Sequence, residues 1–166
     1  ITSEPEIFAA CTDTIVRQVG DIRQMVDEFS DFARMPTPVM QLEDLGQIVQ
    51  HAMLLQRVAN PDIEFNLDLD EAPVTMECDS RQIGQCLTNL LKNAVEAIEG
   101  RGDGPANDEE AGKIVVHVRT ENGDRIIKIE DNGAGLPEQD RDRLTEPYVT
   151  TRARGTGLGL PIVSKI

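Results

Sequence analysis

Apolar residues recur every three or four positions between residues 3 and 34, which is the period of one face of an α-helix. The residues of this face are Ile7, Cys11, Ile15, Val19, Ile22, Val26, Phe29 and Ala33. A helix of this length, about 45 Å, cannot bury such a stripe against itself. The apolar stripe could pack against the helix's own domain. Alternatively, it could pack against a second helix, either in this chain or in a second copy of it. The second helix is favoured, because Met35-Pro36-Thr37-Pro38 ends the first and separates it from the rest of the chain.

Residues 45–78 carry the pattern of one helix and two strands. Asp44 can cap a helix over residues 45–59, which Asn60-Pro61-Asp62 ends. The residues expected to face inward are Leu45, Ile48, Val49, Ala52, Leu55 and Val58. Residues 63–69 alternate between apolar and polar, and residues 74–78 form a shorter run, so both are predicted to be strands.

A long helix is predicted next, with Asp79 or Ser80 as its cap. Its expected inward residues are Ile83, Cys86, Leu87, Leu90, Leu91, Ala94, Val95 and Ile98. Residues 100–112 are mainly Gly, Asp, Glu, Asn and Pro and are expected to form a loop without a part in the core.

Two further strands and a helix complete the pattern. Residues 113–121 and 125–131 alternate, and Asn122-Gly123-Asp124 between them favours a hairpin turn. A last helix is expected to begin at Gly157. The layout predicts an α/β two-layer sandwich, in which helices cover one face of a mixed sheet, preceded by the long helix.

The charge balance argues against a nucleic-acid partner. The 166 residues carry 30 acidic and 16 basic side chains, a formal net charge of −14. Binding of DNA or RNA requires Lys and Arg to neutralise phosphates. No basic stripe that would favour a lipid surface is present either, so we expect no nucleic acid and no direct membrane contact.

The cysteines and the chain ends bear on the compartment. Cys11, Cys78 and Cys86 are odd in number, fit no zinc spacing and lie in apolar-periodic segments, so we expect buried free thiols in a reducing compartment. There is no run of 18 apolar residues, and we expect no signal peptide in these residues. The chain starts without Met and stops in an apolar helical pattern, so we expect a fragment of a longer protein. We expect a cytoplasmic location, as a cytoplasmic protein or as the cytoplasmic part of a membrane-anchored sensor.

Two asparagines stand out on the long helix, in Asn89-Leu90-Leu91-Lys92-Asn93-Ala94. They are four residues apart, so both side chains leave the same helix face. Amides on a core helix need polar partners, which nearby backbone groups or a ligand can supply. An amide oxygen is also a hard, neutral ligand for Mg²⁺, and spacing alone does not choose between the two residues.

Two glycine-rich segments follow at element boundaries. In Asp131-Asn132-Gly133-Ala134-Gly135-Leu136 a carboxylate leaves a strand and could accept a hydrogen bond from an exocyclic amine, although an ordinary turn has the same pattern. Gly155-Thr156-Gly157-Leu158-Gly159-Leu160 opens a helix, whose N–H groups favour phosphate. It follows no strand and no Lys-Ser/Thr comes after it, which excludes the Rossmann fingerprint and the P-loop.

Together with Glu146-Pro147-Tyr148-Val149-Thr150-Thr151, these ordered motifs resemble the ATP-binding half of a sensor histidine kinase, the Bergerat or GHKL fold, over residues 40–166. The Asn-Ala-Val-Glu-Ala segment is similar to the nitrogen-regulation (NtrB/NtrY-like) subgroup. The resemblance implies ATP and Mg²⁺ as ligands, Asn93 as the metal ligand and Asp131 as the acceptor for adenine N6. It implies that the last glycine-rich segment binds the triphosphate and hinges a lid over about residues 136–155. The implied nucleotide-binding residues are Asn89, Asn93, Asp131, Gly133, Gly135, Thr150, Thr151, Arg152, Gly155, Thr156, Gly157, Leu158 and Gly159.

Within the lid, Arg152 and Arg154 are candidates for the phosphates, and Arg152, directly after Thr150-Thr151, is favoured. Solvated arginines are the alternative. The sequence departs from the family in two places. Leu144 stands where many members have Phe, and Glu96 stands where many have a basic residue.

The residue four positions before Asn93 helps to distinguish a phosphoryl-transfer enzyme from an ATP hydrolase. The gyrase, Hsp90 and MutL hydrolases of this fold usually have a Glu there as general base. Asn89 cannot take a proton, so phosphoryl transfer is favoured, with Asn89, Asn93 and Arg152 as the catalytic set.

A histidine kinase also needs an acceptor imidazole. His51 and His117 lack the acidic neighbour and downstream Pro of the family's acceptor box, so both are interpreted as structural. Residues 1–36 resemble the second helix of the dimerisation and histidine-phosphotransfer hairpin, and the acceptor would lie upstream. We therefore expect an ATP-binding catalytic domain over residues 40–166 that does not phosphorylate itself in this fragment.

The expected partners are a second kinase protomer and a response-regulator receiver domain. A GHKL-type Ser/Thr kinase or ATPase, and a nucleotide-binding scaffold without catalysis, remain as alternatives.

Overall fold

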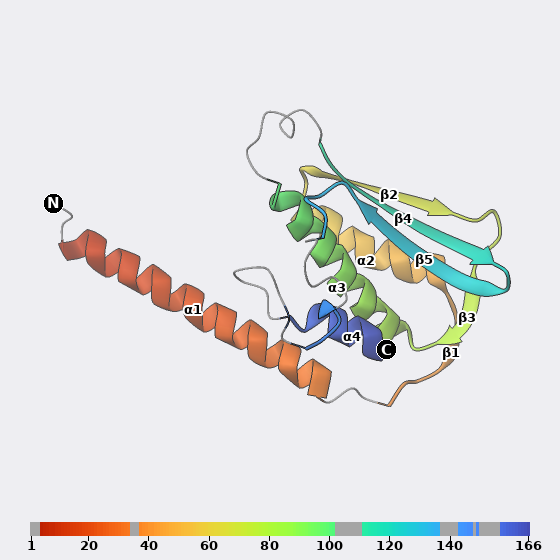
Figure 1. Ribbon diagram of the computed structural model, residues 1–166, viewed down its shortest axis with the longest axis horizontal. Coiled ribbons are helices and arrows are strands. Elements are labelled where there is room, and N and C mark those ends of the chain that lie inside the picture. The colour runs from red at the N-terminus through yellow and green to blue at the C-terminus, as the bar shows by residue number, and fades with distance from the viewer. Residues whose placement is uncertain (1–3, 34–36, 102–110, 137–142, 148, 150–156) are drawn as a thin grey trace.

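The computed structural model describes residues 4–33, 37–101, 111–136, 143–147, 149 and 157–166. A long helix, α1 (Glu4–Ala33), extends to one side of an α/β unit (Figure 1). No helix among the described residues is long and apolar enough to cross a membrane.

The α/β unit contains two small sheets. The elements in chain order are β1 (Gln41–Asp44), α2 (Leu45–Ala59), β2 (Ile63–Leu69), β3 (Thr75–Cys78), α3 (Ser80–Glu99), β4 (Gly112–Glu121), β5 (Asp124–Asp131) and α4 (Gly159–Lys165). The larger sheet has the order β2-β4-β5, with β2 parallel and β5 antiparallel to β4. A smaller sheet pairs β1 with β3 in antiparallel fashion. The predicted mixed sheet with helices on one face is confirmed.

Local sequence explains where the elements begin and turn. Asp44 caps α2 by accepting from the Gly46 N–H at 2.8 Å, and Asp79, not Ser80, caps α3. Asn122 and Gly123 have φ values of 53° and 92°, the left-handed geometry that the hairpin between β4 and β5 requires. Strand β1 was not predicted, and α4 begins at Gly159, two residues after the expected start.

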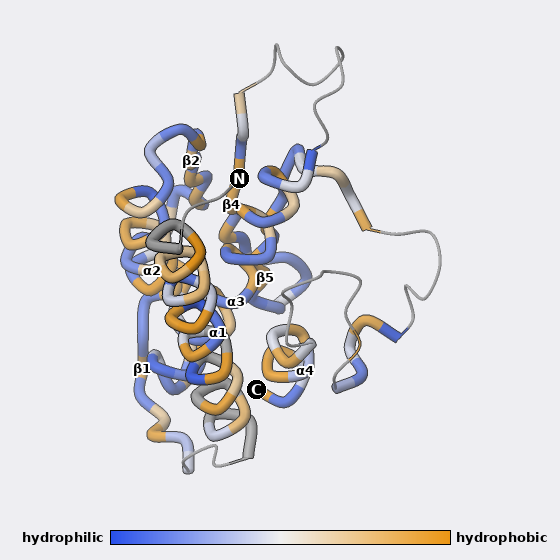
Figure 2. Tube along the Cα trace, turned by 90° about the vertical axis from the view of Figure 1, so that its left-hand side faces the viewer, coloured by the Kyte–Doolittle hydropathy of each residue, from blue (hydrophilic) through white to orange (hydrophobic). Residues whose placement is uncertain are grey.

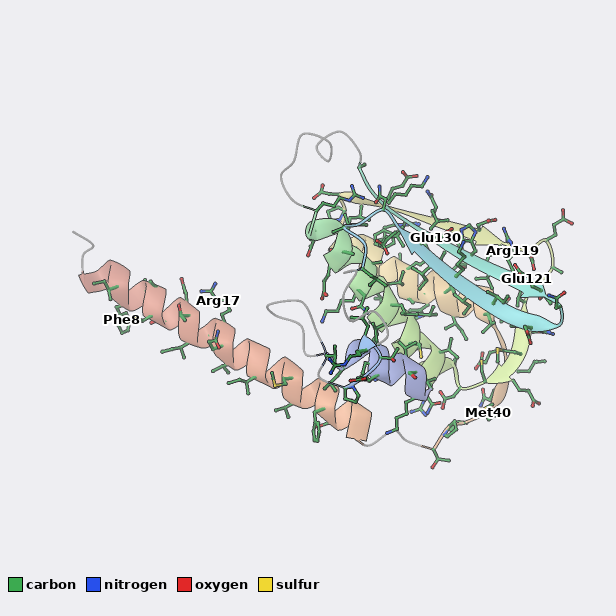
Figure 3. The ribbon with its side chains drawn as sticks, in the orientation of Figure 1. Phe8, Arg17, Met40, Arg119, Glu121 and Glu130 are labelled. Atoms are coloured by element: carbon green, nitrogen blue, oxygen red, sulfur yellow. The ribbon has the colours of Figure 1, made fainter. Side chains whose placement is uncertain are left out.

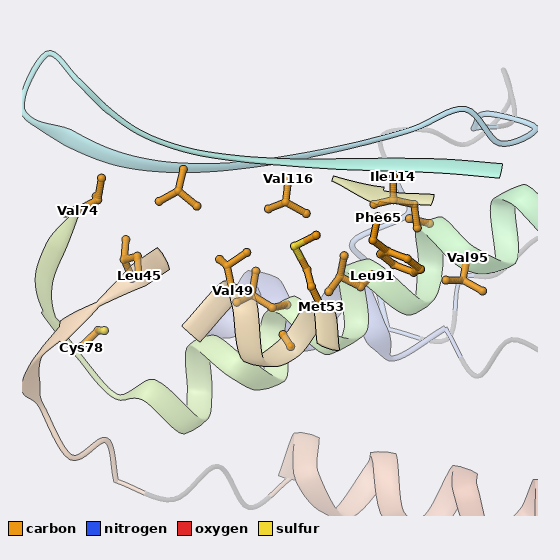
Figure 4. Close-up of a cluster of buried hydrophobic side chains, with 14 residues drawn as sticks. Leu45, Val49, Met53, Phe65, Val74, Cys78, Leu91, Val95, Ile114 and Val116 are labelled. Atoms are coloured by element: carbon orange, nitrogen blue, oxygen red, sulfur yellow. The ribbon is translucent and has the colours of Figure 1, made fainter. Parts of the chain in front are cut away.

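The core lies between the β2-β4-β5 sheet and helices α2 and α3 (Figure 4). Its fully buried side chains include Leu45, Val49, Leu91, Ile114 and Val116. The expected inward face of α3 is confirmed at its centre and C-terminal half, at Leu87, Leu91, Ala94 and Val95.

Three sequence-based expectations about burial are wrong. Leu55 and Val58 are 58% and 77% exposed, because α2 uses Met53, next to Ala52, to contact the core and leaves a second apolar stripe outside. Cys11 is exposed on α1, Cys86 is half-buried and Cys78 is buried; all three cysteines are free, as expected.

The apolar stripe of helix α1 is largely exposed in the part of the chain that the structure describes. Ile15, Val19, Ile22 and Val26 are all more than half exposed, and hydrophobic positions run along much of the helix in Figure 2. Phe8 points into solvent near its start (Figure 3). An exposed stripe of this length has the character of an interaction surface.

The outer face of the larger sheet carries charged side chains in contact across three strands. On β4, His117 Nδ1 lies 2.9 Å from Asp68 Oδ2 of β2, and His117 Nε2 lies 2.8 Å from Glu130 Oε2 of β5. Arg119 also pairs with Asp68, and Arg119 and Glu130 lie on this face in Figure 3. Because side chains alternate along β4, the charged residues face outward and Ile114, Val116 and Val118 face the core.

We expect this network of charged side chains to lower the pH at which the protein unfolds in acid. Hydrogen bonding to Arg119, and then to His117, lowers the pKa of Asp68 from 3.8 to about 2. Because the folded-state pKa is below the unfolded one, the stabilisation is present above pH 3.8 and is lost as the pH falls towards 2. Arg119→Gln should therefore move the acid unfolding midpoint to higher pH, measured by circular dichroism between pH 6 and 2. Arg125→Gln is the control, since the described bonds of Arg125 go to backbone carbonyls; equal shifts in both variants would contradict the assignment.

Candidate functional site

Helix α3 brings Asn93 to the start of α4. A Cβ atom placed on Gly159 would lie 3.9 Å from Asn93 Nδ2 and 4.0 Å from Asn93 Oδ1. The Asn93 amide therefore faces the first residue of α4 across a position with no side chain. One asparagine of α3 and the last glycine-rich segment therefore lie together.

Asn89 lies one helical turn before Asn93 and has an unusual environment. Its Nδ2 is buried and has no hydrogen-bond partner among the described residues. Buried amide groups nearly always have a partner. A polar group outside the described residues is therefore required to satisfy it. Nδ2 is a donor, so the group that completes the site there is an acceptor such as a carboxylate, carbonyl or phosphate oxygen.

The Asp131 loop begins where β5 ends and turns sharply. Asp131 Oδ1 accepts a hydrogen bond from the Gly133 N–H at 2.9 Å, which leaves Oδ2 without a bond among the described residues. Asp131 is exposed. Gly135 has a φ of 76°, which a residue with a side chain rarely adopts. The carboxylate thus has one oxygen that orders its own loop and one that has no bond among the described residues.

Gly133 is needed because the loop approaches α3 closely. A Cβ atom at this position would lie 2.5 Å from the Ala97 carbonyl carbon and 2.7 Å from the Ala97 oxygen. The same oxygen accepts the Ala134 N–H at 2.8 Å. Ala97 follows Asn93 by one turn, about 6 Å along the axis. One helix therefore positions both the Asp131 loop and the Asn93 amide.

Asn132 has a positioning role that the sequence analysis missed. Its Oδ1 accepts the Lys113 N–H at 2.7 Å, and its Nδ2 donates to the Ala111 carbonyl at 3.1 Å. These bonds join the Asp131 loop to the start of β4. An asparagine directly after a strand suggests a side chain that bonds to backbone, but its partners lie about 20 residues earlier, and the local pattern does not show them.

The start of α4 forms the third side of the site. Gly157 has a φ of 68°, and Leu158 is fully buried and precedes the helix without a side-chain cap. The other residues expected to contact phosphate lie outside the described residues. These are Thr150, Thr151, Arg152, Arg154, Gly155 and Thr156. Most of the expected lid over residues 136–155 lies outside them as well, whereas Leu144 is described and half-buried.

The donor set fits a magnesium-bound nucleotide better than a metal alone. Among the described residues, no group of three or more His, Cys, Asp or Glu side chains could hold a metal ion. A neutral amide such as that of Asn93 leaves most of a cation's ligands to water and phosphate oxygens, which suits Mg²⁺. The unpaired donor of Asn89 suits an oxygen-rich anion beside it.

Neither histidine belongs to this site. His51 is exposed on α2, and His117 is held between carboxylates on the outer face of the sheet. Among the described residues, the site therefore contains no imidazole.

Known proteins match this chain in sequence. Nitrogen regulation protein NtrY of Azorhizobium caulinodans is 50% identical over the whole chain, which spans 21% of that protein. A putative NtrY-like sensor histidine kinase of Rickettsia conorii is 37% identical over 92% of the chain and 24% of its own length. The chain thus spans about a fifth to a quarter of the length of these relatives.

Solved structures share the fold. The catalytic domain of histidine kinase ThkA, in a nucleotide-free form, superposes with a TM-score of 0.62 at 28% identity, covering 77% of this chain and 79% of that one. Full-length ShkA in complex with AMPPNP gives a TM-score of 0.72 at 25% identity, covering 99% of this chain and 34% of that one.

A family match agrees with the geometry. The family described as histidine kinase-, DNA gyrase B- and HSP90-like ATPases matches residues 78–166, more than half of the chain. The match includes Asn89, Asn93, the Asp131 loop and the start of α4, the same elements that meet in the structure. The chain therefore belongs to the histidine kinase-, DNA gyrase B- and HSP90-like ATPase family.

Proposed function

We propose that this chain is the ATP-binding, catalytic part of a two-component sensor histidine kinase. It binds ATP with Mg²⁺ and transfers the γ-phosphoryl group to a histidine outside the chain, from which the group passes to an aspartate of a response-regulator receiver domain. The observation that carries the proposal is the meeting of Asn93 with the glycine at the start of α4, one helical turn from the contact between Ala97 and the Asp131 loop.

Each residue has a distinct role in this proposal. The free oxygen of Asp131 accepts a hydrogen bond from the exocyclic amine of adenine, while its other oxygen holds the loop. Asn93 ligates Mg²⁺, and Asn89 donates to a phosphate oxygen. Gly157, Leu158 and Gly159 allow the triphosphate to approach the backbone of α4, and Arg152 contacts the β- or γ-phosphate. Bound Mg²⁺ supplies charge screening of the triphosphate.

Phosphoryl transfer is favoured over ATP hydrolysis because Asn89 occupies the position where the hydrolases of this fold have a general base. Hydrolysis needs a group that accepts a proton from water, and the amide of Asn89 cannot do so. The kinase instead relies on positioning and electrostatics. The names of the relatives, which are nitrogen-regulation and sensor kinases, favour the same choice. A GHKL-type Ser/Thr kinase or ATPase, or a scaffold without catalysis, is the alternative.

We further propose that residues 1–36 belong to the dimerisation region and residues 40–166 to the catalytic domain. The uncovered stripe of α1, with side chains such as Ile15 and Val19 more than half exposed, supports a helical partner in a second protomer.

The test uses a separate acceptor. The chain is mixed with γ-labelled ATP, Mg²⁺ and the segment that precedes the matching region in NtrY of Azorhizobium caulinodans, supplied as a separate peptide domain. We expect acid-labile, base-stable label on that segment and none on the chain itself. Asn93→Ala should reduce the transfer at least about 100-fold, whereas Asn66→Ala, on the outer face of β2, should not change it.

Other outcomes would identify the alternatives. Release of inorganic phosphate without label on the acceptor would indicate an ATPase. Acid-stable label would indicate a Ser/Thr kinase. Nucleotide binding without either product would indicate a scaffold and contradict the proposed function.

A further inference from the structure

A single buried carboxylate joins the connection after α1 to the helix that carries the site. Asp79 is only 4% exposed. Its Oδ2 accepts the backbone N–H of Val39 at 2.8 Å, although Val39 lies 40 residues earlier in sequence. Its Oδ1 accepts the N–H groups of Arg81 and Gln82 at the start of α3, at 2.9 and 3.3 Å. The same side chain therefore caps α3 and anchors Val39.

The anchor is the first of several contacts that fix the chain from Val39 onward. Directly after it, β1 pairs with β3, from Gln41 opposite Cys78 to Asp44 opposite Thr75. The Leu45 N–H then donates to the Val74 carbonyl at 3.0 Å. Before Val39, no contact of this kind is described at Thr37 or Pro38. Asp79 thus marks the point at which the connection joins the α/β unit.

The position of the anchor sets the length of the tether between the two parts. Helix α1 ends at Ala33, and residues 34–38, five in number, separate it from Val39. Six Cα–Cα steps span at most about 21 Å. Without the anchor the first fixed residue would be Gln41 of β1, and the tether would grow to the seven residues 34–40.

A charged side chain suits this role. Hydrogen bonding to the Val39 N–H, and then to the Arg81 side chain, lowers the pKa of Asp79 from 3.8 to about 2, so the group stays ionised even in acidic solution near pH 3.8. Arg81 Nη2 lies 2.9 Å from the same oxygen that accepts from Val39. The ion pair holds that oxygen in place while the Val39 side chain, 57% exposed, contributes little packing. The attachment of Val39 to α3 therefore depends mainly on one hydrogen bond.

We propose that Asp79 is a positioning residue for phosphoryl transfer: by holding Val39 against α3, it fixes the length of the tether through which the catalytic part reaches an acceptor joined to α1. This inference rests on the proposed function, because it requires that the acceptor histidine lies on a segment connected to α1. Asp79 contacts neither the nucleotide nor the acceptor in this account.

Val39→Pro and Asp79→Ser remove the hydrogen bond between Val39 and Asp79 in different ways. Val39→Pro deletes the N–H donor and leaves Asp79 and its cap of α3 unchanged, and Val39→Ala is the matched control that keeps the donor. Asp79→Ser keeps an N-cap oxygen for α3, while its shorter hydroxyl cannot also reach Val39.

The first measurement is amide hydrogen exchange on the whole chain. In the wild type the Val39 amide should be protected although its side chain is exposed, and Asp79→Ser should accelerate its exchange at least about tenfold. The amides of the central turns of α3 should stay protected. A Val39 amide that exchanges freely in the wild type would overturn the anchor itself.

The second measurement compares two arrangements of the acceptor. The NtrY segment is either joined in front of Ile1 or supplied as a separate domain. Val39→Pro and Asp79→Ser should lower the rate in the joined arrangement about 1.6-fold, the effect of lengthening the tether from five to seven residues alone. They should leave the rate on the separate acceptor unchanged, which a variant damaged in its nucleotide site would not do.

The outcomes separate the two proposals. Equal rates of Val39→Pro and Val39→Ala in the joined arrangement would overturn the positioning role while the proposed function stands. If the wild type transfers to neither acceptor, the proposed function fails and the positioning role fails with it; hydrogen exchange then still reports whether Asp79 anchors Val39.

Discussion

Asp131→Asn is expected to weaken ATP binding about 100-fold, measured by calorimetric titration with Mg²⁺ present. Asparagine keeps an oxygen that can accept the Gly133 N–H, so the loop stays ordered. The second position then carries an N–H donor, which opposes the amine donor of adenine. The loss of a hydrogen bond to a charged group, about 1.5–3 kcal/mol, together with a misplaced donor, accounts for the magnitude.

A change of nucleotide makes this prediction specific. Inosine triphosphate carries an acceptor oxygen where ATP carries the amine. The Asn variant should therefore prefer inosine triphosphate over ATP, while the wild type prefers ATP. The same loss of affinity for both nucleotides, with a lowered thermal midpoint, would show that the substitution damages the loop and would contradict the assigned role.

Gly133→Ala is expected to lower the free energy of unfolding by about 3 kcal/mol, measured by urea titration. The new methyl group would lie within 2.7 Å of three atoms of Ala97, two of which belong to the backbone. Backbone of a buried helix cannot move aside as a flexible side chain can. The loop would instead move away from α3, so nucleotide binding should fall with stability.

Two alanine substitutions serve as controls for Gly133. At Gly112 the close atoms belong to the side chains of Ile98 and Ile63, which can shift more easily than backbone. Gly112→Ala should therefore lower the free energy of unfolding less than Gly133→Ala does. At Gly84, inside α3, no atom lies within 4 Å of the new Cβ, and alanine favours the helix by about 1 kcal/mol. A Gly133→Ala variant as stable as Gly84→Ala would contradict the close contact.

The sequence predicted the long elements well because their patterns are local. The bounds of α2 and β2 agree with the structure, and both Asp44 and Asp79 act as the caps that their positions suggested. Strand β1 escaped prediction because four residues are too few for an alternating pattern, and its partner β3 lies more than 30 residues later. Pairing of this kind is not visible in local periodicity.

Burial on α2 was predicted only in part. Leu55 and Val58 continue the helical spacing of the core residues, but Leu54, Leu55 and Val58 form a stripe on the other side, where they are more than half exposed. Periodicity identifies an apolar stripe without saying which of two stripes meets the sheet. That choice is made by the position of β2 and β4 above the helix.

The functional motifs were recognised as an ordered set that resembles a known family, whereas spacing alone did not choose between Asn89 and Asn93. The structure places Asn93 beside the start of α4 and the Asp131 loop against Ala97 of α3. The bonds of Asn132 to Ala111 and Lys113, and the anchor of Val39 on Asp79, could not be predicted, because both join residues that only the tertiary fold brings together.

The central position of β4 also has a consequence for synthesis on the ribosome. Among the described residues, strand β2 pairs only with β4, from Ile63 opposite Gly112 to Leu69 opposite Val118. While the chain emerges, β2 therefore has no sheet neighbour until about 50 further residues have followed it, whereas β1, β3, α2 and α3 can already assemble. During that interval the apolar side of β2, including Phe65, stays open to water or to chaperones. Translation of β4 ends this vulnerable period, and slowing the ribosome just before Gly112 should prolong it.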